Sequence, residues 1–154
     1  MAQLSGAPGS ASEPRSIRVA GEADIPFILQ VAFSAYGFDN PEIITSWLRK
    51  ALKEPNCRVL VGGHSVGVGY AFQTFYWKKP RGHILHVASI PKGMSTEALR
   101  LMRSLVEWLK EKGCFEVTFG SEIGVDYAPF AARLGAVRAA PSYVIRFDQE
   151  PEYA

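Results

Sequence analysis

The turn Pro91-Lys92-Gly93 combines the residue types that an anion-binding site needs. An apolar strand pattern over His83–Ile90 precedes this turn, and a helix pattern that starts at Ser95 follows it. A strand, a short glycine turn and a helix together present backbone N–H groups and a partial positive charge to an anion. Lys92 adds a mobile cation beside them. The stretch therefore predicts a phosphate-binding turn.

Two residues next to this turn, Ser95 and Glu97, would weaken phosphate binding. Ser95 is a good helix cap, and its hydroxyl would take an N–H group that a phosphate could otherwise use. Glu97 brings a negative charge to the first turn of the helix, which stabilises the free helix but repels a pyrophosphate. At a separation of about 6 Å this repulsion is worth roughly 1–3 kcal/mol.

Composition excludes several classes of protein. The chain has 154 residues, which suits one domain, and its net charge is +2, with 17 basic and 15 acidic residues. This balance argues against nucleic acid or an anionic membrane as the main partner. The basic run Lys78-Lys79-Pro80-Arg81 is interpreted as a hairpin turn. Single-stranded nucleic acid, stacking on Tyr76 and Trp77, is a weaker alternative for that run.

Targeting and metal-binding signals are not found in the sequence. Residues 1–15 are small and polar, which predicts a flexible arm ahead of one domain at 16–154, and no apolar run reaches the roughly 20 residues of a membrane span. Cys57 and Cys114 have no zinc-ligand spacing and are interpreted as free thiols. We therefore expect a cytoplasmic protein without a structural metal.

Apolar periodicity and turn residues define the expected elements. They are strand 16–20, helices 24–37 and 40–52, strands 57–61, 66–77 and 83–90, a helix from Ser95 to Gly113, strand 116–119, helix 127–134 and strand 142–147. An antiparallel meander followed by a strand-helix-strand crossover predicts an α/β (α+β) fold with a mixed central sheet and helices on both faces. A cleft is expected where antiparallel pairing changes to parallel pairing.

This order resembles the GCN5-related N-acetyltransferase (GNAT) family over residues 16–147. The stretch 86–93 is similar to the family's fourth strand and the start of its cofactor loop, and 130–136 is similar to its late helix. The resemblance implies acetyl-CoA as cofactor and an amine as acceptor. The pantetheine arm would contact the backbone of Ala88 and Ile90. The pyrophosphate would be held by Lys92, Gly93, Met94, Ser95 and Thr96.

The resemblance also suggests catalytic residues. Many family members protonate the leaving thiolate with a tyrosine of the late helix. Ala131 stands at that position here, and Tyr127, one helical turn earlier, is the candidate or else a structural residue. A general base on the fourth strand would be His83 or His86, which should point to opposite faces. His86, nearer the turn, is chosen, although a structural histidine is the alternative.

Glu122 and Asp126 are reserve candidates for the base, or else loop and capping residues. A non-enzymatic function is the main alternative to acetyl transfer. Internal virion proteins of some short-tailed phages resemble acetyltransferases but lack the usual loop and tyrosine, as this chain does. In that case the chain would be an assembly protein of a virion, docked partly by its N-terminal arm.

Overall fold

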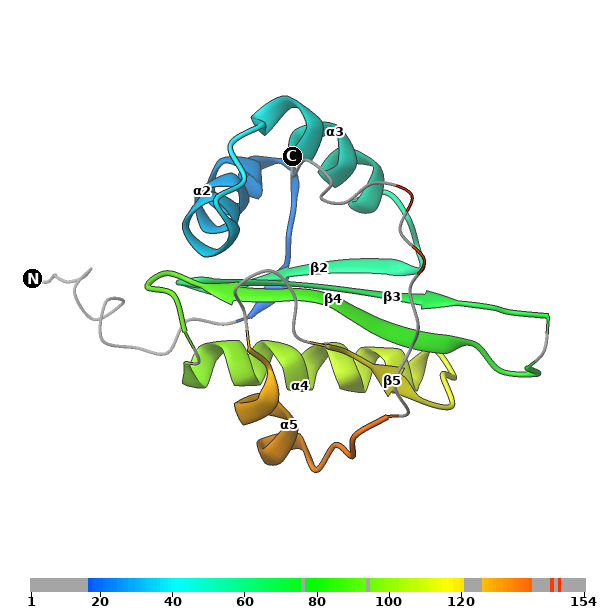
Figure 1. Ribbon diagram of the computed structural model, residues 1–154. Helices are drawn as coiled ribbons and strands as arrows, with labels where there is room; N and C mark the ends of the chain where they lie inside the picture. Colours follow the sequence, from blue (N-terminus) through cyan, green and yellow to red (C-terminus); the bar gives the residue numbers. More distant parts are fainter. Residues whose placement is uncertain are drawn as a thin grey trace, which may run out of the picture.

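The computed structural model describes residues 17–75, 77–93, 95–120, 126–139, 145 and 147 (Figure 1). Its elements follow the predicted order. They are β1 (Arg18–Val19), the 3₁₀ helix η1 (Glu22–Asp24), α2 (Ile25–Tyr36), α3 (Pro41–Ala51), β2 (Cys57–Val61), β3 (Ser65–Phe72), β4 (Arg81–Ser89), α4 (Thr96–Glu111), β5 (Val117–Thr118) and α5 (Ala128–Leu134). The expected strand at 142–147 lies outside the described residues, apart from positions 145 and 147.

The described strands form one mixed sheet in the order β1-β2-β3-β4-β5. The first four pair antiparallel, whereas β4 and β5 are parallel and pair only at Gly82–Val117 and His83–Thr118. The predicted fold class is therefore confirmed. Beyond His83, no described strand pairs with the outer edge of β4. This opening lies beside the start of α4 and positions the candidate site.

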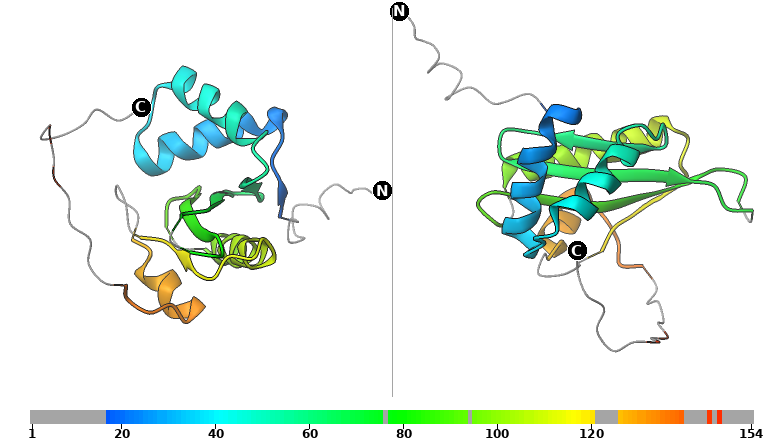
Figure 2. Two further views of the ribbon diagram at one scale, coloured as in Figure 1. Left: turned by 90° about the vertical axis from the view of Figure 1, so that its right-hand side faces the viewer. Right: turned by 90° about the horizontal axis from the view of Figure 1, so that it is seen from above.

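Helices cover both faces of the sheet, as the sequence predicted (Figures 1 and 2). Helices α2 and α3 lie on one face, and α4 and α5 lie on the other. The core is divided accordingly. On the α2/α3 side the buried residues include Ile25, Ile28, Val31, Leu48, Val59, Val61, Val66 and Val68. On the α4 side they include Ile84, Val87, Leu101, Met102, Leu105, Leu109, Tyr127 and Phe130.

Local sequence signals fix most helix ends. Asn40 accepts a hydrogen bond from the Ile43 N–H at the start of α3, and Gly37 ends α2 in the left-handed region at φ 74°. The expected end of one strand is wrong, because β3 ends at Phe72 rather than at residue 77. Phe33 of α2 is 61% exposed, although it follows the helical spacing of the apolar residues Ile25, Ile28 and Leu29.

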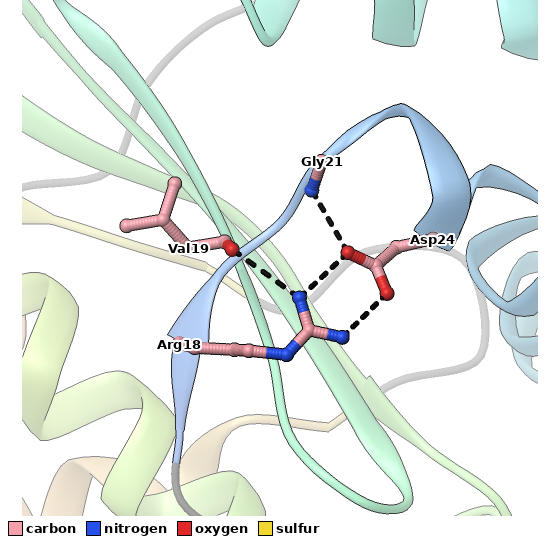
Figure 3. A network of polar contacts seen from close by, with 4 residues as sticks. All are labelled: Arg18, Val19, Gly21 and Asp24. Atoms are coloured by element: carbon pink, nitrogen blue, oxygen red, sulfur yellow. Dashed lines mark hydrogen bonds and ion pairs between the residues drawn. The ribbon is translucent and has the colours of Figure 1, made fainter.

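The start of α2 is held by an ion pair (Figure 3). Asp24 occupies the N-cap position, but its carboxylate does not cap the helix. It accepts bidentate hydrogen bonds from Arg18 at 2.7 and 2.8 Å and a third from the Gly21 N–H at 2.8 Å. Hydrogen bonding by Arg18, and then by Gly21, lowers the pKa of Asp24 to about 2. The network ties β1 to the first helices.

Replacing Asp24 with asparagine is expected to lower the free energy of unfolding by about 1 kcal/mol at pH 7, because the exposed partner Arg18 is screened by solvent. The folded-state pKa of about 2 lies below the ordinary value of 3.8, so the contribution is present above pH 3.8 and is lost as the pH falls toward 2. Urea unfolding at pH 7 and pH 3 measures it. The Glu22→Gln control breaks an exposed pair with Arg49 and should change stability by less than about 0.5 kcal/mol.

Helix α4 approaches the sheet closely because β4 carries a glycine beneath its last turns. A Cβ atom added at Gly82 would lie 2.9 Å from Leu109 Cδ1 and 3.2 Å from Leu109 Cβ. Gly82→Ala is therefore expected to cost about 1–3 kcal/mol by overpacking, measured as a shift of the urea midpoint. Gly120→Ala is the control, since its added methyl would meet no described atom within 4 Å. Equal effects of the two substitutions would contradict the packing explanation.

The basic run lies on the β3–β4 hairpin, which extends beyond the helices (Figure 1). Arg81 pairs with Glu116 and lies over the Phe115 ring, so only Lys78 and Lys79 of the run are exposed cations. Tyr76, one of the two expected stacking residues, lies outside the described part of the chain.

Both cysteines are free and half-buried, and burial raises the pKa of each thiol. Within the described ranges, no group of three or more His, Cys, Asp or Glu side chains could hold a metal ion. Within the same ranges, no helix combines the length and apolar character that a membrane span requires.

Candidate functional site

The start of α4 keeps free backbone donors. Ser95 caps the helix as predicted, because its hydroxyl accepts from the Ala98 N–H at 3.0 Å and lies 3.2 Å from the hydroxyl of Ser89. The N–H groups of Ser95, Thr96 and Glu97 donate to no other described residue. The Ser95 hydroxyl thus takes one N–H and leaves three without an acceptor among the described residues, at the positive end of a 16-residue helix. Lys92 and Gly93 lie exposed just before it, and Met94 lies outside the described residues.

The carboxylate of Glu97 is engaged by the turn between β2 and β3. It accepts from the Gly63 N–H at 3.0 Å, the His64 N–H at 2.7 Å and the Ser65 hydroxyl at 2.5 Å. Partial burial raises the pKa of Glu97, but these three hydrogen bonds together outweigh burial, and the net shift is downward. The negative charge of Glu97 is therefore stabilised by three hydrogen-bond donors. Its repulsion of a pyrophosphate at the start of α4 should be smaller than the sequence alone predicted.

Strand β4 contains one residue more than β3 requires. His86 is paired with Val68 and Ile84 with Gly69, which is the next residue of β3, so Leu85 is the extra residue of a β-bulge. A bulge interrupts the alternation of side chains along a strand. Residues on either side of Leu85 therefore no longer follow the simple period of two.

This bulge overturns the expectation for the two histidines. Ile84 packs on the α4 side, so its neighbour His83 points to the α2/α3 face. His86 lies on the same α2/α3 face, where its ring centroid is 5.1 Å from that of Tyr36. His83 places Nδ1 2.9 Å from the Thr118 hydroxyl. The prediction that the two histidines face opposite ways is wrong, because it assumed a regular strand.

The backbone of β4 offers a ligand different residues from those expected. The Ile90 N–H donates to the His64 carbonyl at 2.8 Å, so the backbone groups of Ile90 and Ala88 point toward β3. Val87 and Ser89 alternate with them and point toward the open edge. The predicted pantetheine contacts at Ala88 and Ile90 thus involve backbone groups that β3 engages. The pantetheine contacts stay a prediction, and the outward direction of Val87 and Ser89 could not be read from the sequence, because only the observed register reveals it.

Tyr127 closes part of this open edge. Its side chain is buried, its hydroxyl lies 2.8 Å from the Val87 N and 3.4 Å from the Val87 O, and its ring contacts Phe119 and Phe130. The hydroxyl thus forms hydrogen bonds with backbone groups of Val87 that could otherwise pair with a strand or a ligand. Its role as proton donor stays a prediction. Of the reserve bases, Asp126 accepts from the Ala128 N–H at 3.0 Å at the start of α5, and Glu122 lies outside the described residues.

A cavity of about 320 Å³ lies between the α2 and α3 helices and part of the sheet. Its described lining is apolar and aromatic, with no Asp, Glu, Lys or Arg. The lining residues are Ile28, Val31, Ala32, Tyr36, Phe38, Ile43, Ile44, Trp47, Leu48, Val66, Val68, Leu85, His86 and Ala88. The predicted base His86 therefore lies in the wall of this cavity. A more open depression of about 510 Å³ runs along the exposed side of α3 and contains none of the predicted site residues.

Solved structures share this fold. A putative acetyltransferase from Agrobacterium tumefaciens superposes with a TM-score of 0.72 at 17% identity, covering 85% of this chain and 99% of its own. A GNAT family acetyltransferase of Staphylococcus aureus gives a TM-score of 0.65 at 14% identity, covering 88% of this chain and 100% of its own. An aminoglycoside N-acetyltransferase in complex with CoA gives 0.71 at 10% identity, covering 87% and 95%.

The fold is that of the GNAT acetyltransferases, as the sequence resemblance implied. No protein-family model matches the sequence, and no curated protein matches it either.

Proposed function

We propose that this chain binds acetyl-CoA at the start of α4 and transfers the acetyl group to an amine by direct attack. The observation that carries the proposal is the set of N–H groups at Ser95, Thr96 and Glu97 that donate to no described residue, beside Lys92 and the stretch of β4 beyond His83 that pairs with no described strand. These donors and the helix dipole suit a pyrophosphate. The GNAT fold of the chain supports the same position for the cofactor.

The chemistry would rest mainly on positioning. The amine nitrogen attacks the thioester carbon, the C–N bond forms, the C–S bond breaks, and CoA leaves as a thiolate that takes up a proton. Holding both reactants in the cleft supplies most of the acceleration. We propose that His86 acts as the general base, which removes a proton from the amine directly or through a water molecule. The protonation of the thiolate by Tyr127 would require its hydroxyl to leave the Val87 backbone, where it now lies.

Isothermal titration of the full chain with acetyl-CoA tests the proposal. We expect saturable binding, weakened about three- to tenfold by Lys92→Ala, since one exposed cation contributes about 1 kcal/mol to a phosphate contact. Lys110→Ala, in the last turn of the same helix, is the matched control and should bind like the parent. Absence of both heat and a thermal shift at millimolar acetyl-CoA would refute the proposal.

One observation favours a second candidate, a catalytically inactive binding or assembly module. The Tyr127 hydroxyl occupies the Val87 backbone at the point where β4 is open, and so stands where a thioester arm would need to bind. In an assembly protein, a covered β4 edge would prevent unwanted pairing with the strands of other molecules. Co-purification of a stable partner, together with no release of CoA from acetyl-CoA in the presence of amines, would support this alternative. Its location in a phage virion stays a prediction.

A further inference from the structure

We infer that the 320 Å³ cavity between α2, α3 and the sheet binds a small hydrophobic molecule that carries one amine. The binding itself requires no acetyl-CoA. The identification of this molecule as the acceptor deepens the proposed function and rests on it.

The lining determines the chemical class of the ligand. Apart from His86 and three aromatic residues, Tyr36, Phe38 and Trp47, the described lining is aliphatic, and the rings of Tyr36 and Phe38 stack with centroids 5.1 Å apart. Removing a charged group from water is costly unless a counter-charge receives it. Since no acidic side chain lines the described wall, a polycation such as an aminoglycoside would bury ammonium groups without partners. Each buried charge adds such a cost, so the cavity favours an apolar body and disfavours any amine beyond the one that the proposed reaction requires.

The polar end of the ligand would lie at His86. Apart from the indole of Trp47, His86 and Tyr36 are the only described lining residues whose side chains carry a nitrogen or oxygen atom, and their rings pack 5.1 Å apart. His86 directly precedes Val87, whose backbone faces the open edge of β4. An amine beside His86 would thus stand one residue from the place proposed for the thioester.

The size and entrance of the cavity narrow the ligand further. Its volume is near the lower end of the range of about 300–1,000 Å³ for small-molecule pockets, which suits a single ring with a short chain. Two large lining residues of α3 are partly open to solvent, Ile43 at 55% and Trp47 at 43% exposure. These exposed apolar side chains mark the side from which the apolar part of a ligand could enter the cavity.

Titration of the full chain with 2-phenylethylamine, without acetyl-CoA, tests this inference by calorimetry and ligand-observed NMR. We expect saturable binding at least about tenfold tighter than that of spermidine, the polycationic comparison. Ala32→Phe fills the cavity and should abolish binding. Ser34→Phe adds the same side chain to an exposed position of α2 outside the cavity and should leave it unchanged.

A second variant keeps the test decisive if Ala32→Phe does not fold. Trp47→Ala removes a partly exposed lining ring and should weaken binding about tenfold, because the ligand would lose an aromatic contact. Equal affinities for spermidine and 2-phenylethylamine, no saturable binding of the latter, or binding unchanged in Trp47→Ala would each overturn the inference. Acetyl-CoA titration is independent of this assay, so a failure of the cofactor proposal would be recognised separately.

Discussion

Tyr127→Ala is expected to lower the free energy of unfolding by about 3–5 kcal/mol, and Tyr127→Phe by about 1–3 kcal/mol. The alanine removes a ring that is 2% exposed and packs between Phe119 and Phe130. The phenylalanine keeps the ring but leaves the Val87 N–H and C=O without the hydroxyl that meets them at 2.8 and 3.4 Å. Urea unfolding followed by far-ultraviolet circular dichroism measures both.

Tyr70→Phe is the matched control for this prediction. Tyr70 is a half-buried residue of β3 whose ring contacts Phe72 and His83, and its hydroxyl has no described hydrogen-bond partner. We expect a change below about 0.5 kcal/mol there. If Tyr127→Phe were equally harmless, the hydroxyl would not be an important backbone partner.

The same variant separates the two roles considered for Tyr127. If the hydroxyl protonates the leaving thiolate, Tyr127→Phe should lower kcat about 10²–10⁴-fold while KM for acetyl-CoA changes little. If the hydroxyl only completes the edge of β4, kcat per folded molecule should stay at the parent value while stability falls. Activity corrected for the folded fraction distinguishes these outcomes.

Glu97→Ala is expected to cost about 2–4 kcal/mol at pH 7, because three donors of the β2–β3 turn lose a charged acceptor. One of them, the hydroxyl of Ser65, is fully buried and cannot turn to water instead. The hydrogen bonds lower the folded-state pKa of Glu97. The contribution is therefore present above the ordinary pKa of a glutamate and is lost as the pH falls through the lowered value.

A double-mutant cycle with Gly62 checks this assignment. A Cβ atom at Gly62 would lie 2.6 Å from Glu97 Cδ, so Gly62→Ala should displace the carboxylate and destabilise the parent. In the Glu97→Ala background the same substitution meets no carboxylate and should cost much less. Additive effects would show that the turn does not depend on Glu97. Glu107→Ala, an exposed residue of the same helix, is the matched control.

Much of the fold could be predicted from local patterns, because local physics determines the features concerned. The caps at Asn40 and Ser95 and the left-handed glycine at Gly37 follow from backbone hydrogen bonding within a few residues. The apolar stripe of α4 is buried as the helical period requires. For Phe33 periodicity was not enough, since the exact rotation of a helix depends on the neighbour it packs against.

The candidate site was less predictable, because it depends on pairings between distant segments. The bulge at Leu85 arises from the register of β4 against β3, and it decides which way His86 points. The partners of Glu97 lie more than 30 residues earlier in the chain, so only its helix-end position could be predicted. The contact of Tyr127 with Val87 likewise spans 40 residues.

Glu97 gives this molecule a built-in reporter. It sits in the first turn of α4, beside the amides offered to an anion, and its carboxylate holds the Gly63 and His64 amides of a separate hairpin. Any ligand that rigidifies the helix start would therefore also slow deuterium uptake at those two amides. Exchange mass spectrometry could then detect occupancy of the helix start at a separate hairpin, before any substrate is known.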